Sequence, residues 1–251
     1  MINNKELFIF GEPIETDFGM LRFLTYKEYL QNISELSLIS QNILHLYYLY
    51  KKQLEQDKVS KEYLDEFKQF KEQSLYSVVV NTEYILEAYV KIIKLVIDCN
   101  NYAENELMDI ISLIFSSEDY FIYIRKMIMD MNILTEDDVS PNEEIQRGIE
   151  RSRRVKQQEN EKSSFVDIVT SIVASTSNTF EDVCNMTVFQ VYAIYARIGA
   201  IFNYNTTTLF ATVAEKVKIE SWNKHIDLFE KENHAIDYSK FSKQFGSMLD
   251  D

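Results

Sequence analysis

The middle of the chain reads TEDDVSPNEEIQRGIERSRRVKQQENEKSS over residues 135–164, and this polar stretch decides how the fold is divided. Pro141 and Gly148 interrupt it, and between Pro141 and Phe165 it holds three large apolar residues, Ile145, Ile149 and Val155. Three such side chains cannot build a core. We therefore expect a flexible charged linker at residues 136–164, with room for a short helix, between two helical domains.

Charge is sorted within this linker. Acidic residues gather at 136–144 and basic residues at 147–156. Opposite charges so close along the chain favour pairing with each other over binding an outside partner. We expect such pairing to shorten and stiffen the linker, and salt to relax it.

Composition sets the fold class on either side of the linker. Hydrophobic residues make up 46% of the chain, while 251 residues include only five glycines and two prolines. That scarcity removes most of the turn chemistry that β-sandwiches and hairpins need. We predict a mainly α protein, with a helical domain at residues 1–135 that carries a small N-terminal β-hairpin, and a smaller all-α domain at residues 165–251.

The formal charge of −14 limits the partners. Phosphate contacts need a basic surface, so we expect neither nucleic acid nor an anionic membrane as a partner. The N-terminus lacks the pattern of a signal peptide, and no apolar run reaches the roughly 18 residues of a membrane span. Cys99 and Cys184 show no CxxC spacing, which indicates reduced thiols in a cytoplasmic protein.

The N-terminal domain should begin with the hairpin and continue as helices. Apolar runs at residues 6–10 and 20–24 flank the glycine-containing and proline-containing segment GEPIETDFG, which predicts two strands and a turn. Thr25 and Glu28 have capping-box spacing, so a helix should start at Tyr26. Its apolar positions recur every three or four residues and predict one long helix, with a face of Leu36, Ile39, Ile43, Leu46, Tyr50 and Leu54.

Residues 75–99 are apolar on more than one side and predict the central helix of this domain. Two shorter helices should follow at residues 104–115 and 117–132. The last of them is rich in methionine, with Met127, Met129 and Met131. Flexible methionines fill irregular cores, and they also line adaptable surfaces for partner helices. We predict Met127, Met129 and Met131 as partner-binding residues, with core filling as the alternative.

The C-terminal domain shows the same helical periodicity. Thr187 and Gln190 form a second capping-box pattern, and we expect the helix that follows to break at residues 203–205. A further helix should run to Val217, and a last one should begin near Trp222. In the tail, Tyr238, Phe241 and Phe245 have helical spacing, and we predict that they bind a partner groove or fold back on their own domain.

No motif points to catalysis. None of His45, His225 and His234 has a second histidine or a cysteine at metal-ligand spacing, so we expect no metal site. The glycines never cluster, which excludes phosphate-binding and dinucleotide-binding loops, and no GxSxG nucleophile pattern occurs. We therefore predict a protein that is not an enzyme, with no catalytic residues and no cofactor.

One C-terminal region resembles a known family. It reads TFEDVCNMTVFQVYAIYARIGAIFNYNTTTLFATV at residues 179–213, followed by KIESWNKHIDLF at residues 218–229. A Met-Thr-x-x-Gln helix start, the downstream Arg197 and the Trp222 segment are similar to those of tail assembly chaperones of long-tailed bacteriophages. The resemblance covers the last third of the chain in its residues, and the remainder in layout.

The resemblance implies a non-enzymatic chaperone that binds the phage tape measure protein, recruits tail tube protein, and self-associates along its client. It also implies a location in the host cytoplasm and absence from the mature virion. Two alternatives remain open: a chaperone of baseplate assembly, and a structural tail or baseplate adaptor subunit of the virion.

Overall fold

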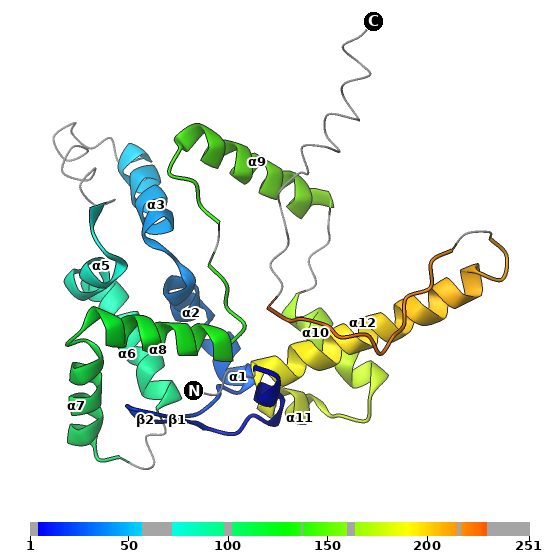
Figure 1. The fold of residues 1–251 in the computed structure, drawn as a ribbon, viewed down its shortest axis with the longest axis horizontal. Coiled ribbons are helices and arrows are strands. Elements are labelled where there is room, and N and C mark those ends of the chain that lie inside the picture. Colours follow the sequence, from blue (N-terminus) through cyan, green and yellow to red (C-terminus); the bar gives the residue numbers. More distant parts are fainter. Residues whose placement is uncertain are drawn as a thin grey trace, which may run out of the picture.

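The computed structural model describes residues 5–56, 72–97, 102–136, 138–159, 164–214 and 217–229, and helices dominate them (Figure 1). The predicted mainly α fold with a small N-terminal hairpin is confirmed. The helices are η1 (Lys5–Phe10, a 3-10 helix), α1 (Tyr26–Gln31), α2 (Ile33–Ser40), α3 (Ile43–Gln56), α5 (Leu75–Asn81), α6 (Glu83–Val96), α7 (Glu104–Ile114), α8 (Glu118–Met131), α9 (Glu143–Glu159), α10 (Phe165–Ser175), α11 (Phe180–Asn185) and α12 (Val188–Phe210).

The first strand and the turn of the hairpin lie within the segment that the sequence predicts as the turn, and the second strand overlaps the one predicted at residues 20–24. Strands β1 (Ile14–Thr16) and β2 (Gly19–Leu21) pair antiparallel. Thr16 Oγ1 accepts the Phe18 N–H at 3.2 Å and donates to the Gly19 carbonyl at 2.7 Å, which closes the turn. Gly19 has φ +100°, a conformation that glycine adopts without steric cost.

The strand predicted at residues 6–10 is wrong, because these residues form η1. Phe8 is buried within this short helix and meets Phe23 edge-to-face at 5.2 Å between ring centroids. Gly11, at φ +66°, ends the turn by donating its N–H to the Phe8 carbonyl. A short helix that buries one ring therefore takes the place of the predicted strand.

The capping box at Thr25 and Glu28 is confirmed, and α1 starts at Tyr26 as predicted. The single long helix expected after it is wrong, since α1, α2 and α3 are separate. Asn32 ends α1 with its side-chain amide on the Glu28 carbonyl, and Asn42 Oδ1 accepts the His45 N–H at the start of α3. Asparagine side chains compete for backbone groups in this way and so interrupt helices.

The first core surrounds α6. The central place predicted for residues 75–99 is confirmed, but the single helix expected there is wrong, because Thr82 separates α5 from α6. Five of its large side chains are at most 1% exposed: Ile85, Tyr89, Ile92, Ile93 and Val96. Burying a side chain of this size stabilises the fold by about 1.5–3 kcal/mol. Helices α2, α5, α7 and α8 pack against α6 or against one another around it.

Arg125 of α8 fastens the end of α2 to this core. Its Nε donates to the Ile39 carbonyl at 2.9 Å and its Nη2 to the Gln41 carbonyl at 3.1 Å, while Nη1 pairs with Glu136. The planar guanidinium thus satisfies carbonyls that the end of a helix leaves without partners.

The second core joins the C-terminal helices to α1. Its buried members are Tyr26, Ile168, Ile172, Val183, Val188 and Val191. Capping boxes start α10 at Ser164, α11 at Thr179 and α12 at Thr187. The sequence interpretation missed α11, although its Thr179 and Asp182 are three residues apart as in a capping box.

Two predictions for the C-terminal part are wrong. Helix α12 continues through residues 203–205 without a break, because asparagine costs a helix only some tenths of a kcal/mol and no glycine or proline follows. Residues 217–229 form turns and extended chain, so the helix predicted from Trp222 does not occur.

The central linker contains a longer helix than expected, α9, and its acidic residues pair elsewhere. Glu136 pairs with Arg125 of α8, and Glu143 with Lys51 of α3. Within α9, Arg154 Nη2 lies 3.9 Å from Glu150 Oε2. The acidic end of the linker is thus held by the N-terminal helices, and the Glu150–Arg154 pair lies within the linker itself. The division into residues 1–135, 136–164 and 165–251 stays a prediction.

Ile133 connects the two cores at a conformational cost. It follows α8 with φ 52°, where an L side chain costs about 1–2 kcal/mol, and packs against both cores. The Leu134 N–H donates to the Met129 carbonyl at 2.8 Å, the bond of a Schellman motif, in which glycine is the usual residue.

We predict that Ile133→Ala destabilises the protein more than Ile133→Gly. Both variants lose the packing of the isoleucine, but only glycine relieves the backbone, which should leave Ile133→Gly more stable by about 0.5–1 kcal/mol. Urea unfolding followed by circular dichroism measures this difference. The reverse order would show that Ile133 carries no strain.

A second prediction concerns alkaline pH. Burial raises the pKa of Tyr29 and of Tyr89 to about 12. Between pH 10 and pH 12 the unfolded chain releases these protons while the folded chain keeps them, so stability falls as pH rises, by up to about 1.4 kcal/mol per pH unit for each tyrosine. Urea unfolding at several pH values should show that the free energy of unfolding falls less steeply with pH in Tyr89→Phe than in the wild type. Equal slopes would contradict the assignment of Tyr89.

Candidate interaction surface

Helix α12 is fixed at its base by polar contacts. The Gln190 N–H donates to Thr187 Oγ1 at 3.2 Å, and Gln190 Oε1 accepts the Thr187 N–H at 2.9 Å. The same side chain reaches η1, because Gln190 Nε2 donates to the Ile9 carbonyl at 2.8 Å. One glutamine therefore starts the helix and joins it to the N-terminal segment.

Ring contacts add to this anchor. Phe189 is buried, and its ring lies 6.0 Å from that of Phe8 and 6.0 Å from that of Phe229. Lys5 Nζ lies 4.1 Å from the centroid of the Phe229 ring. The base of α12 is thus held between the start of the chain and the segment at residues 217–229.

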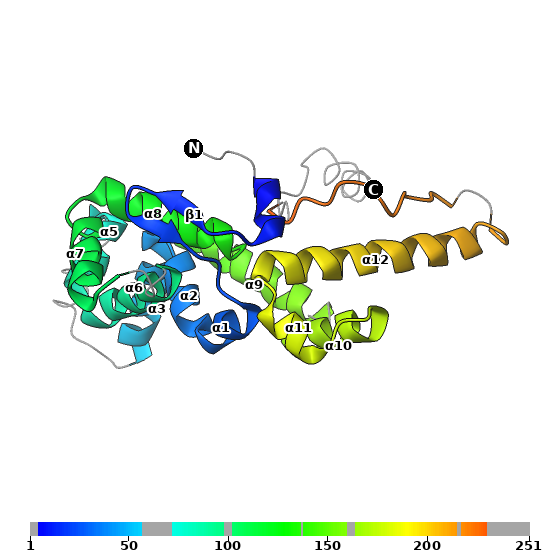
Figure 2. The ribbon, with the colours of Figure 1, turned by 90° about the horizontal axis from the view of Figure 1, so that it is seen from below.

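The distal half of α12 projects beyond the other helices (Figures 1 and 2). The last residue of the helix that belongs to the second core or packs against it is Ile198. Beyond it, Phe202 is 59% exposed and Leu209 is 71% exposed. The exposed large apolar side chains at this end are Ile201, Phe202, Leu209, Phe210 and Val213.

Two of these side chains, Phe202 and Leu209, continue a seam that starts in the second core. The positions follow one another at intervals of three and four residues: Val188, Val191, Tyr195, Ile198, Phe202, Asn205 and Leu209. Such intervals place side chains along one face of a helix. The first four belong to or pack against the second core, and the last three, Phe202, Asn205 and Leu209, are exposed. We call these three the distal stripe.

The distal half of α12 is also nearly without charge. Residues 188–214 contain a single charged side chain, Arg197, in a chain of net charge −14. Arg197 Nη1 donates to the carbonyls of Trp222 and Lys224, the latter at 2.9 Å, and so holds the returning segment beside the helix. A cluster of exposed large apolar side chains on an uncharged surface is typical of a site for protein contacts.

The predicted partner-binding methionines lie elsewhere. Met129 and Met131 are buried in the first core, and Met127 is half-buried against it. Their burial matches the core-filling alternative, and partner binding by them stays a prediction. Tyr238, Phe241 and Phe245 lie outside the described residues.

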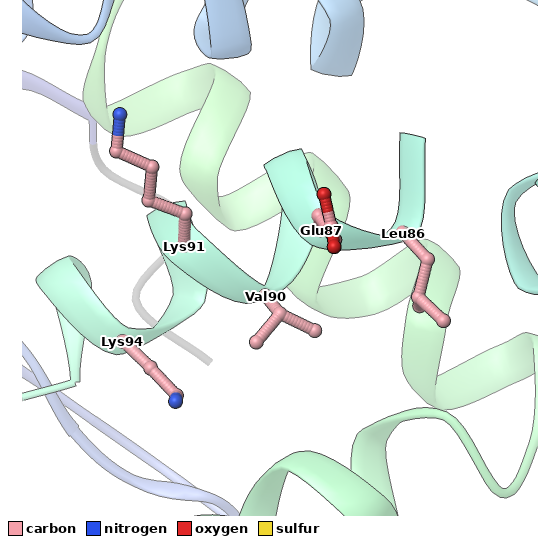
Figure 3. Close-up of a pocket in the computed structure, with 5 residues that line it drawn as sticks. All are labelled: Leu86, Glu87, Val90, Lys91 and Lys94. Carbon is pink, nitrogen blue, oxygen red and sulfur yellow. The ribbon is translucent and has the colours of Figure 1, made fainter. Parts of the chain in front are cut away.

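A shallow depression of about 410 Å³ lies along α6 (Figure 3). Leu86 and Val90 form its apolar part, and Glu87, Lys91 and Lys94 surround them. Lys91 pairs with Glu35 of α2 and lowers the pKa of that carboxyl by hydrogen bonding. The lining comes from one helix face, with no converging polar groups, so the depression offers less to a ligand than the face of α12 offers to a protein.

In the part of the chain that the structure describes, no three histidine, cysteine, aspartate or glutamate side chains are grouped so that they could hold a metal ion. Among the described helices, α12 included, none combines the length and apolar character needed to cross a membrane. Cys184 is a free, half-buried thiol, and Cys99 lies outside the described residues.

Comparison with known proteins places the chain in a family. The family model of the YomV N-terminal domain matches residues 2–141, more than half of the chain. The chain belongs to the YomV family. The model of the YomV second domain matches residues 156–227, which include α12.

A curated member of this family is the SPbeta prophage-derived uncharacterized protein YomV of Bacillus subtilis (strain 168). It is 34% identical over 234 residues, which cover 92% of each chain. No solved structure matches the chain. Membership of the YomV family supports a phage origin for this protein, as the resemblance to phage proteins predicts, and assigns no role within the phage.

The sequence contained a signal for the α12 surface that the interpretation did not use. Twenty-seven residues with one charge stand out in a chain with 40 acidic and 26 basic residues. The helix break predicted at residues 203–205 divided this run into two ordinary segments, which hid its length.

Gly11 gives a test of the anchor at the base. A Cβ on Gly11 would lie 2.9 Å from Thr187 Cγ2, and the backbone has φ +66°. We predict that Gly11→Ala costs about 1–3 kcal/mol, through strain and displacement of the capping box. Gly199→Ala in α12 is the matched control, since a Cβ there meets nothing within 4 Å and should stabilise by about 0.5–1 kcal/mol. Thermal unfolding compares the two, and equal melting temperatures would contradict the anchor.

Proposed function

We propose that this YomV family protein is a non-enzymatic chaperone of phage tail assembly, which binds the tape measure protein through the distal half of α12. The observation that carries the proposal is the pair of exposed apolar side chains, Phe202 and Leu209, on an uncharged helix surface of an acidic protein. Support also comes from the resemblance to tail assembly chaperones and from the phage origin of the family.

The chemistry of the surface suits a helical client. A long, partly apolar chain aggregates through its exposed apolar faces until the tail tube encloses it. Covering such a face with a helix of matching apolar spacing removes it from water, while the net charge of −14 keeps the complexes apart. Several copies along one client add avidity to weak single contacts. The chaperone acts in the host cytoplasm and leaves before the virion is complete.

Recruitment of tail tube protein belongs to the same proposal, but its physical basis changes. We expected two domains that move independently on a flexible linker. In the structure the Tyr26 N–H donates to the Met186 carbonyl at 2.7 Å, and Phe8 meets Phe189. These contacts join the two parts, so a tail tube subunit would bind the same body that presents α12.

That joined body also favours one alternative, a structural tail or baseplate adaptor subunit. A unit with fixed parts and one projecting helix suits a permanent assembly as well as a transient one. The baseplate chaperone differs from the main proposal only in its client. Mass spectrometry of purified virions separates these roles, because a chaperone is absent from the particle and an adaptor is present in stoichiometric amount.

We predict that Phe202→Asp combined with Leu209→Asp abolishes client protection. Co-expression with the tape measure protein of the same phage should raise the soluble yield of that protein, and the double variant should bind it roughly a hundredfold more weakly, because two apolar side chains no longer leave water. The matched control is Phe165→Asp with Val166→Asp on α10, which are 55% and 51% exposed. Loss of protection by the control, or none by the α12 variant, would place the client elsewhere.

A further inference from the structure

We infer that the distal stripe of α12 pairs with the same stripe of a second copy, antiparallel and centred near Asn205, when no client is bound. Only the competition between a client and the second copy rests on the proposed function. The pairing itself follows from the charge, spacing and exposure of the stripe.

Charge decides in favour of a second copy. Two molecules that each carry a net charge of −14 repel one another wherever their acidic surfaces face each other. Helix α12 has no acidic residue, and its one base, Arg197, is engaged by the Trp222 and Lys224 carbonyls. Contact through the distal half therefore brings no like charges together.

Spacing decides the geometry. The seam keeps the three-and-four intervals of a coiled coil from Val188 to Leu209, and its second half is exposed. An antiparallel pair with its twofold axis close to Asn205 sets Phe202 of each copy opposite Leu209 of the other. The two asparagines then lie side by side, where their amides can hydrogen-bond. A polar residue within an apolar seam fixes the register of such pairs at some cost in stability.

Shape permits this arrangement. Because the distal half of α12 extends past the other helices, an antiparallel partner would place its own body beyond the tip, away from the first (Figure 2). The interface is isologous, since the same residues serve both copies, and so it closes at a dimer. A short seam of this kind gives a weak dimer, which leaves the face free to exchange a second copy for a client.

Sedimentation velocity of the full-length protein alone tests the pairing. We expect a reversible monomer–dimer equilibrium in the micromolar range, and Leu209→Asp should raise its dissociation constant by at least about tenfold. Leu209 is 71% exposed, so circular dichroism should show an unchanged fold. Ile122→Asp on α8, at a side chain 52% exposed, is the matched control and should dimerise like wild type. A wild-type protein that stays monomeric throughout the micromolar range overturns the inference. So does a dimer that Leu209→Asp leaves intact.

Disulfide trapping tests the direction of the helices, in a background with Cys99 and Cys184 replaced by alanine. With the axis near residue 205, Asn205→Cys brings two thiols close together, whereas Leu209→Cys leaves them about 10 Å apart along the helix, too far for a disulfide. A crosslink with Asn205→Cys alone supports the antiparallel pair. Crosslinks at both positions indicate parallel helices and overturn it. Dimerisation without client protection would refute the proposed function alone, and protection by a strict monomer would refute this inference alone.

Discussion

The start of α1 is the constraint on which the rest of the structure depends. Arg22 donates two hydrogen bonds to the Glu28 carboxylate, from Nη1 to Oε2 and from Nη2 to Oε1, both at 2.9 Å. Glu28 Oε2 also accepts the Thr25 N–H at 2.9 Å. Hydrogen bonding from Arg22 holds the pKa of this carboxyl below its usual value. Tyr26, which follows Thr25, is 1% exposed in the second core, and its N–H donates to the Met186 carbonyl. One capped turn therefore sets where the C-terminal helices attach.

From this attachment follows the exposure of α12. The turn before the helix is bonded to α1 and its first turn is bonded to η1, so the direction of the helix is set at its base. On this side of α12, the contacts with the second core reach only as far as Ile198. The remaining seam must either stay in water or find another chain. Stability of the base and availability of the distal stripe thus have one cause, a helix of 23 residues attached at one end.

Several parts of this arrangement were accessible from the residues themselves. Capping boxes at Thr25 and Thr187 predicted two helix starts, because the reciprocal bonds are local and need no tertiary context. The central helix followed from its apolar character on several sides. Helix breaks were predicted less well: Asn32 and Asn42 interrupt a periodic apolar face, whereas the asparagines at residues 203–205 do not interrupt α12. The same residue type ends a helix only where its side chain finds a backbone group to bond.

By itself, the sequence determined the mainly helical class, the small hairpin near the N-terminus, the central place of α6, and the lack of any motif for catalysis. Local bonding and apolar periodicity act within a few residues, so they can be recognised along the chain. Only the tertiary structure decided that Met129 and Met131 are core, that the acidic end of the linker pairs with α3 and α8, and that half of α12 is exposed. Exposure depends on which distant segments arrive to cover a face, and the seam of α12 has the same spacing in both halves.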